Sequence, residues 1–275
     1  MATMALRPKR YLSPFRYPGG KSWLLPTVRK WLNAQLPKPA VLVEPFAGGA
    51  AVTLMAVDED LVAAAHFAEL DDDVAAVWQA VLNGGAAWLA EHIEDFSIGR
   101  RTVKAKLKEV PGSLHERALQ CLVRNRTARG GVLQSGAGLL RDGDGRGIAS
   151  RWYPKTLAAR IMSISKLKQQ LHFYPGNGFA LMQQFAGRKD VVFFVDPPYR
   201  SAASRLYKHW EIDHMHLFEF LEGVAGSVLM TYDATFEIRK LASDHGFQVK
   251  SIPMKTTHHE SKRELMISRD FDWLS

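Results

Sequence analysis

The chain has 275 residues, of which 47% are hydrophobic and 23% are charged, a composition typical of a globular protein with a sizeable core. No apolar run approaches the roughly 20 residues of a membrane span, and the N-terminus lacks an apolar stretch of signal-peptide length. The single cysteine, Cys121, excludes an internal disulfide framework, and no Cys/His cluster has zinc-site spacing. We therefore expect a cytoplasmic protein with no metal and no membrane partner.

The net charge of +8 is concentrated in one part of the chain. Residues 100–168 hold sixteen Lys/Arg and four Asp/Glu, a local balance of +12, so the remaining residues sum to −4. A basic segment of this kind favours a nucleic-acid partner, although a well-solvated helical surface has the same composition.

The first motif is FRYPGGKSW, residues 15–23, and a helical pattern follows its serine. Tyr17 offers a flat aromatic face, and the two glycines give a flexible backbone. Lys21 stands at the helix start, where a cation opposes the helix dipole, so we expect an anionic group such as a carboxylate beside it. The sequence GGKS lacks the upstream glycine of a P-loop, which argues against that phosphate site.

The second motif is VEPFAGGAAV, residues 43–52, which follows a short apolar run at 41–44. Its glycines allow a ligand to approach the backbone closely. A second run at 64–69 ends in Glu69, 25 residues after Glu44, where an acid can accept hydrogen bonds from ribose hydroxyls. The pair indicates a nucleoside site without a pyrophosphate clamp, the alternative being a tight turn and a surface acid.

The middle of the chain departs from this strand–helix rhythm. A helix is expected at 71–82, and residues 85–165 then combine helical stretches with a glycine-rich loop at 129–147. Asp-Gly pairs in that loop indicate turns. We interpret residues 85–165 as an insertion that also carries the excess positive charge.

The third motif is FFVDPPYR, residues 193–200, at the end of an apolar run that starts at 191. Asp196 lies where open α/β sheets bind ligands, and neither Pro197 nor Pro198 has an amide N–H. A carboxylate and a backbone carbonyl make two acceptors for an exocyclic amine, while Tyr199 supplies a stacking surface. A base has to leave its duplex to reach such a pocket. The alternative is an ordinary strand-ending turn.

The remaining pattern completes an α/β domain. We expect a helix at 212–224 and strands at 227–232, 247–254 and 264–268. Apolar strands alternating with helices predict a doubly wound, mostly parallel sheet. The predicted division is a domain formed by 1–84 and 166–275, with 85–165 inserted into it.

The order of these motifs resembles that of the Dam-type DNA adenine N6-methyltransferases over nearly the whole chain. FRYPGGK, VEPFAGG and AELDDD come first, then the basic insertion, and then DPPY. Within the insertion, VRNRTARGG at 123–131 resembles the segment that opens the family's target-recognition region. The resemblance implies a Rossmann-like methyltransferase sheet with one antiparallel strand. It also implies S-adenosyl-L-methionine as cofactor, double-stranded DNA as partner and adenine N6 of a flipped base as the methyl acceptor.

Residue roles follow from the same resemblance. It assigns S-adenosylmethionine binding to Tyr17, Lys21, Glu44, Phe46, Ala47, Gly48, Glu69 and Asp196. It assigns the target amine to Asp196 and the Pro197 carbonyl, with Pro198 completing the motif and Tyr199 stacking on adenine. For DNA contacts, the basic insertion offers Arg124, Arg126, Arg129, Arg141 and Arg146.

Several alternatives stay open on the sequence. The methyl acceptor could be cytosine N4, RNA or a protein amide, or the chain could be a catalytically silent DNA-binding relative. The recognition sequence, a role in restriction–modification, phage protection or host regulation, and the choice between monomer and weak dimer are equally open. A bacterial or phage origin is expected.

Overall fold

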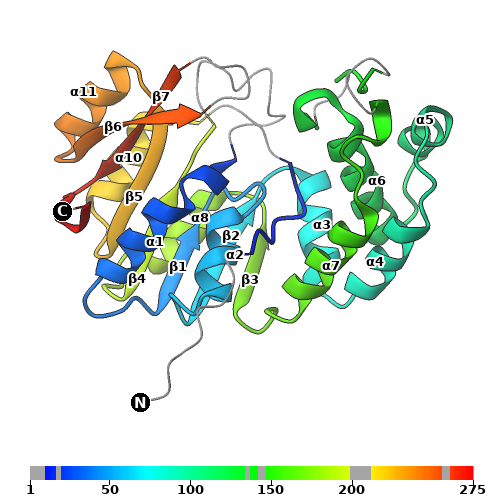
Figure 1. Ribbon diagram of the computed structural model, residues 1–275. Coiled ribbons are helices and arrows are strands. Elements are labelled where there is room, and N and C mark those ends of the chain that lie inside the picture. The colour runs from blue at the N-terminus through cyan, green and yellow to red at the C-terminus, as the bar shows by residue number, and fades with distance from the viewer. Residues whose placement is uncertain are drawn as a thin grey trace.

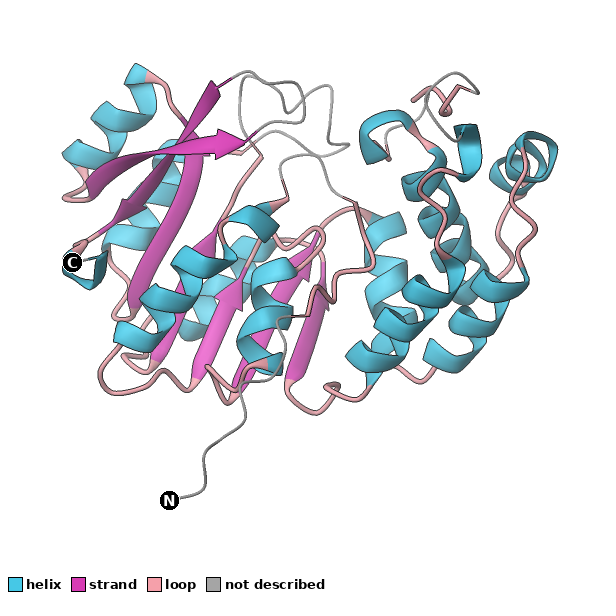
Figure 2. Cartoon of the chain, viewed as in Figure 1, coloured by secondary structure: helices cyan, strands magenta, loops and turns pink. Residues whose placement is uncertain are grey.

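The computed structural model describes residues 10–16, 20–133, 137–141, 147–198, 212–255 and 261–274. Seven strands form one sheet in the order β3-β2-β1-β4-β5-β7-β6. Only β7 runs antiparallel to its neighbours, pairing with β5 on one side and β6 on the other. This confirms the expected mostly parallel, Rossmann-like sheet with one antiparallel strand (Figure 2). The strands are β1 (Val41–Glu44), β2 (Ala64–Glu69), β3 (Leu171–Pro175), β4 (Val191–Val195), β5 (Ser227–Asp233), β6 (Gln248–Lys255) and β7 (Ser261–Ser268).

Helices cover both faces of the sheet (Figure 1). They are α1 (Leu25–Ala34), α2 (Ala51–Asp58), α3 (Asp72–Leu82), α4 (Ala86–Asp95), α5 (Arg100–Lys108), α6 (Leu114–Thr127), α7 (Pro154–Ser165), α8 (Gly178–Phe185), α10 (His214–Glu222) and α11 (Phe236–Asp244). Short 3-10 turns lie at η1 (Lys21–Trp23), η2 (Arg129–Gly131), η3 (Gly147–Ala149) and η4 (Asp272–Leu274).

Alternation along the strands divides the buried side chains into two clusters. Leu42 faces one cluster and its neighbours Val41 and Val43 face the other, as the twofold period of a strand requires. The second cluster includes side chains from α8, α10 and α11. The first includes α1, α2 and α3 and also α4 to α7, so the helices of residues 86–165 share a core with the sheet.

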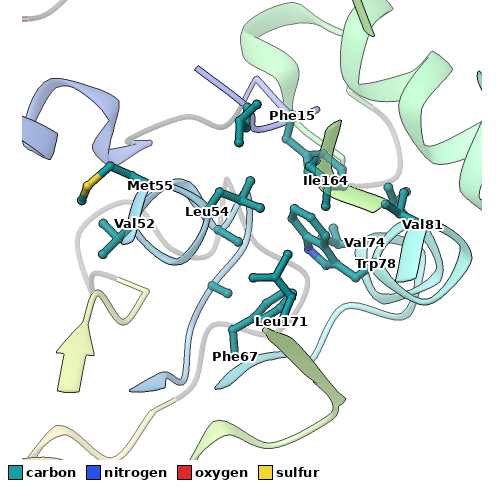
Figure 3. Packing of buried hydrophobic residues seen from close by; sticks show 14 of the residues in the cluster. Phe15, Val52, Leu54, Met55, Phe67, Val74, Trp78, Val81, Ile164 and Leu171 are labelled. Atoms are coloured by element: carbon teal, nitrogen blue, oxygen red, sulfur yellow. The ribbon is translucent and has the colours of Figure 1, made fainter. Parts of the chain in front are cut away.

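Trp78 of α3 lies where the sheet and these additional helices meet. It is fully buried, and its ring lies 5.3 Å from that of Phe67 on β2 and 5.7 Å from that of Phe15. Figure 3 shows it between Phe15, Ile164 of α7 and Leu171 of β3. A residue of α3 thus joins the helical layer to the strand edge at β3.

Most expected elements are present with small shifts at their ends. The runs at 41–44 and 64–69 are β1 and β2, and the helix expected at 71–82 is α3. The sequence did not predict β3, because this edge strand carries partly exposed side chains and lacks an apolar run. The Asp-Gly turns at 142–145 lie outside the described residues.

Candidate active site

Three parallel strands end at one edge of the sheet and direct their carboxyl ends to the site. β1 ends at Glu44, β2 ends at Glu69, and Asp196 follows the last residue of β4. The sequence motifs around these residues are therefore brought to the same edge, although Asp196 lies 152 positions after Glu44.

Lys21 lies between two carboxylates at this edge. Its Nζ atom is 2.9 Å from Oδ2 of Asp196 and 3.6 Å from Oε1 of Glu264. The Lys21 side chain is 5% exposed and that of Glu264 is 4% exposed, whereas that of Asp196 is 21% exposed. The carboxylates expected beside Lys21 are thus present, and of the two acids it is Asp196 that reaches the surface.

Thr231 of β5 holds the other oxygen of Asp196. Its Oγ1 donates a hydrogen bond of 2.6 Å to Oδ1, and the residue is fully buried. Both carboxylate oxygens therefore have a fixed neighbour. Each oxygen of an ionised carboxylate has about two acceptor positions, so one oxygen can accept from more than one donor at once.

Glu264 and Thr231 are site residues that the sequence reasoning did not identify. Because β7 is antiparallel, its early residues lie beside the carboxyl end of β5, where Glu264 pairs with Asp233. The sequence does show an acid, Glu264, at the start of the apolar run ELMIS. Only the antiparallel direction of β7 places that acid at the same edge of the sheet as Asp196.

Glu44 is the last residue of β1, and its side chain contacts the start of α2. Its Oε2 accepts a 2.8 Å hydrogen bond from the Thr53 amide of α2, and the residue is 4% exposed. Burial raises the pKa of Glu44 to about 8; the nearby Asp196 raises it further, whereas the bonds from Thr53 and the charge of Lys21 lower it. Its contacts close the turn from β1 to α2.

The loop between β1 and α2 presents backbone at the ligand edge. Gly48 has a positive φ of 47°, a conformation that favours glycine, and its carbonyl accepts a 3.0 Å bond from Trp78 Nε1. Phe46 is partly exposed and packs edge-on against Phe179 with ring centroids 6.5 Å apart. Ala47 is buried, and its amide donates to the Ala68 carbonyl at 3.0 Å.

Glu69 ends β2 beside this loop. Its Oε1 accepts a 2.8 Å hydrogen bond from the Asp71 amide, and the residue remains partly exposed. Desolvation raises the pKa of Glu69 to about 7, and the backbone amides of Asp71, Leu70 and Gly48 counteract part of this rise. An added hydrogen-bond donor would favour the ionised form further.

Three predicted site residues, Tyr17, Tyr199 and Arg146, lie outside the described residues. Of the prolines after Asp196, Pro197 is buried and Pro198 is partly exposed.

The arginines predicted to contact DNA differ in their surroundings. Arg129 and Arg141 are exposed and Arg124 is partly exposed. Arg126 has a different position from the one we expected, because it is 5% exposed and its guanidinium donates to the Pro14 carbonyl. Burial lowers the pKa of Arg126 to about 10.

Helix α5 supplies exposed cations that the sequence reasoning had counted only as part of the basic segment. Arg101, Lys104 and Lys108 are exposed, while Val103 on the same helix is fully buried. The Arg100 guanidinium donates a 2.9 Å bond to the Leu140 carbonyl, which ties α5 to the glycine-rich segment. In a helix with Val103 buried, helical periodicity places Arg101, Lys104 and Lys108 on the opposite, solvent-facing side, so the sequence could have identified these three residues.

Within the described part of the chain, no cluster of three or more His, Cys, Asp or Glu side chains is arranged to hold a metal ion. The helices described there are too short or too polar to cross a membrane.

No family model matches the chain, and no curated protein matches its sequence. Several solved structures are similar in fold. The Bacillus subtilis M1A22 tRNA methyltransferase TrmK has 11% identity and a TM-score of 0.41, with 90% of this chain and 66% of that chain covered. The rRNA methyltransferase aviRa from Streptomyces viridochromogenes has 14% identity and a TM-score of 0.39, with 90% and 84% covered.

A third similar structure is Streptococcus pneumoniae Sp1610 in complex with S-adenosyl-L-methionine. It has 12% identity and a TM-score of 0.41, and the match covers 90% of this chain and 72% of that chain. This chain spans about two thirds of the length of TrmK. Likeness of this degree says nothing about the substrate, so any assignment of chemistry depends on this chain's own residues.

Proposed function

We propose that the protein is an S-adenosylmethionine-dependent methyltransferase that modifies adenine N6 in double-stranded DNA, acting on a base turned out of the helix. The observation that supports this most directly is the setting of Asp196. It follows β4 at the ligand edge, remains 21% exposed, and has both oxygens oriented by Lys21 and Thr231. An oriented and partly exposed carboxylate suits an exocyclic amine, which has two N–H donors.

The residues around the loop at 45–50 fit the proposed cofactor. Gly48 brings backbone without a side chain to the surface, Phe46 is partly exposed beside it, and Glu69 places a carboxyl group at the end of the next strand. We propose that Glu69 accepts hydrogen bonds from the ribose and that Phe46, Ala47 and Gly48 line the cofactor. When bound, S-adenosylmethionine supplies an electrophilic methyl group carried on a sulfonium.

The chain's own contribution is mainly orientation and charge placement. Hydrogen bonds from the target amine to Asp196 and to the Pro197 carbonyl would draw the nitrogen lone pair out of conjugation with the ring. No strong base is needed before transfer, because the nitrogen loses its proton as it becomes cationic. Lys21, held between Asp196 and Glu264, would also face the anionic carboxylate of the cofactor's methionine portion.

We propose that nucleic-acid affinity comes from the exposed cations of the helical layer. They include Arg101, Lys104 and Lys108 of α5, with Arg129, Arg141 and partly exposed Arg124. Phosphate contacts of this type make binding strongly dependent on salt concentration.

The test is transfer of radiolabelled methyl groups from S-adenosylmethionine to unmethylated DNA, with tRNA and ribosomal RNA in parallel reactions. We expect label in DNA, on adenine N6 after digestion, in one short sequence context. Label in RNA alone would replace the DNA proposal by the RNA alternative, and label on cytosine would replace adenine as the target. No transfer to any of them by folded, cofactor-binding protein would contradict the proposal.

Asp196→Ala tests the residue role. We expect turnover to fall by roughly 10²–10⁴-fold, the range for losing an oriented catalytic group, while the cofactor dissociation constant changes much less. The matched control is Asp190→Ala, which removes an exposed acid just before β4. Turnover of Asp196→Ala within a few-fold of the native protein would contradict the assignment.

A further inference from the structure

Residues 10–16, which we call the strap, run between the sheet and the helical layer just ahead of Lys21. On the sheet side, Ser13 Oγ donates a 2.6 Å bond to the Gly49 carbonyl in the loop after β1. Arg10 pairs with Asp58 at the end of α2. Phe15 is 1% exposed and packs on Trp78, as Figure 3 shows.

On the helical side, Asn125 of α6 bonds the strap through both ends of its amide. Its Oδ1 accepts from the Arg16 amide at 2.9 Å, and its Nδ2 donates to the Arg16 carbonyl at 3.1 Å. The same Nδ2 donates to the Gly131 carbonyl at 2.9 Å. Asn125 is fully buried, and its bond to the Gly131 carbonyl is buried as well, whereas Arg16 is exposed.

Two arginines of the basic segment also donate to strap carbonyls. Arg126 donates to the Pro14 carbonyl, and Arg160 of α7 donates to the Ser13 carbonyl at 3.1 Å. Gly131 approaches so closely that a Cβ atom there would lie 2.2 Å from the Arg16 carbonyl oxygen. The motif VRNRTARGG therefore contributes an amide, a guanidinium and a glycine that all serve to hold the strap.

The strap limits where Lys21 can lie. Lys21 lies five positions after Arg16, and an extended chain covers at most roughly 3.6 Å per residue, so their Cα atoms are within about 18 Å of each other. Asn125 holds Arg16 at the end of the strap, and the Lys21 ammonium is paired to Asp196 and Glu264. A shift of α6 would move Arg16, and the strap would carry that shift through Ser13 to the Gly49 carbonyl in the loop after β1.

From these contacts we infer that Asn125 and Arg126 are positioning residues of the cofactor site and do not contact nucleic acid. They hold the strap, and through it Lys21, in the arrangement that binds the cofactor. The inference rests on the proposed function, because it takes S-adenosylmethionine as the ligand beside Lys21.

The main test uses Asn125→Asp, which keeps the size of the side chain but replaces the Nδ2 donor by an oxygen facing two carbonyls. We expect the dissociation constant for S-adenosylmethionine, measured by calorimetry without DNA, to rise at least tenfold. DNA affinity at fixed salt should change less than twofold. Asn33→Asp is the matched control, because Asn33 is an exposed asparagine on α1 that donates to the Arg29 carbonyl.

Arg126→Gln distinguishes a phosphate contact from a structural bond to the strap. If Arg126 paired with a phosphate, its removal would lower the slope of log affinity against log salt by about one. Our inference predicts an unchanged slope, a weaker cofactor affinity, and partial recovery in Arg126→Lys, which keeps a donor. Arg129→Gln, at an exposed neighbouring position, should show the opposite pattern.

A role in stability alone would lower the melting temperature and leave the cofactor affinity of the folded protein unchanged, which would overturn the inference. If either α6 variant fails to fold, Arg160→Met removes the bond to the Ser13 carbonyl and the guanidinium over the Tyr11 ring, and should still weaken cofactor binding about threefold. If the native protein binds no S-adenosylmethionine, the proposed function itself fails. If native and variant proteins bind it equally, only the positioning role fails.

Discussion

The buried carboxyl of Glu44 predicts an unusual dependence of stability on pH. Burial raises the pKa of Glu44 to about 8, from 4.5 for an exposed carboxyl. Between these values the folded chain holds a proton at this site that the unfolded chain has released, so the free energy of unfolding falls as pH rises through the window. A gap of about 3.5 pH units, at 1.36 kcal/mol each, sets a ceiling of about 5 kcal/mol.

Glu44→Gln removes this titration and keeps an oxygen that can accept from the Thr53 amide. Urea unfolding from pH 5 to 9, without cofactor, measures the effect. The stability of the variant relative to the native protein should increase with pH, by at least about 2 kcal/mol across the range. The exposed Glu91→Gln serves as control. Parallel pH profiles for the native protein and Glu44→Gln would show that the pKa of Glu44 is not raised in the folded protein.

Three further predictions use other parts of the chain. Gly178→Ala would place a Cβ atom 2.1 Å from the Pro45 carbonyl oxygen, so we expect a loss of about 1–3 kcal/mol in urea unfolding, and no loss would contradict this contact. Burial, followed by the charges of nearby basic groups, lowers the pKa of His66 to about 4, so stability present above pH 6.5 should be lost as pH falls towards 4. His66→Gln should reduce that loss in melting temperature. Arg101→Gln combined with Lys104→Gln should lower the salt slope of DNA binding by about two, and an unchanged slope would remove α5 from the interface.

Part of the sheet could be predicted closely because several strands, such as Val41–Glu44, Ala64–Glu69 and Ser227–Asp233, are largely apolar runs that end in an acid. Val41–Glu44 and Ala64–Glu69 have the bounds expected from sequence, because the first is buried throughout and the second buries Ala65, Phe67 and Ala68. The sequence does not predict the edge strand Leu171–Pro175, because most of its side chains are partly or fully exposed and it therefore contains no apolar run. The sequence signal therefore weakened where burial weakened.

The site could be predicted only in part for a different reason. Residues within a motif, such as Lys21 and Asp196, are recognised together with their neighbours. Glu264 and Thr231 come from strands whose relative direction sets their distance from Asp196, and spacing along the chain does not reveal it. Likewise, composition counts Arg126 as a cation whether it faces solvent or a buried carbonyl.

The arrangement around Lys21 links orientation of the target amine to binding of the cofactor. A carboxylate that accepts hydrogen bonds from an amine has to be held in one direction, and Asp196 is held by Thr231 on one oxygen and Lys21 on the other. Lys21 is also paired with buried Glu264, and removing one partner of a buried ion pair leaves an expensive uncompensated charge. The position of the ammonium is therefore set by the fold before any ligand arrives. We inferred that the strap helps to position Lys21. The contacts that α6 makes with the strap should therefore affect both cofactor binding and the orientation of the target amine.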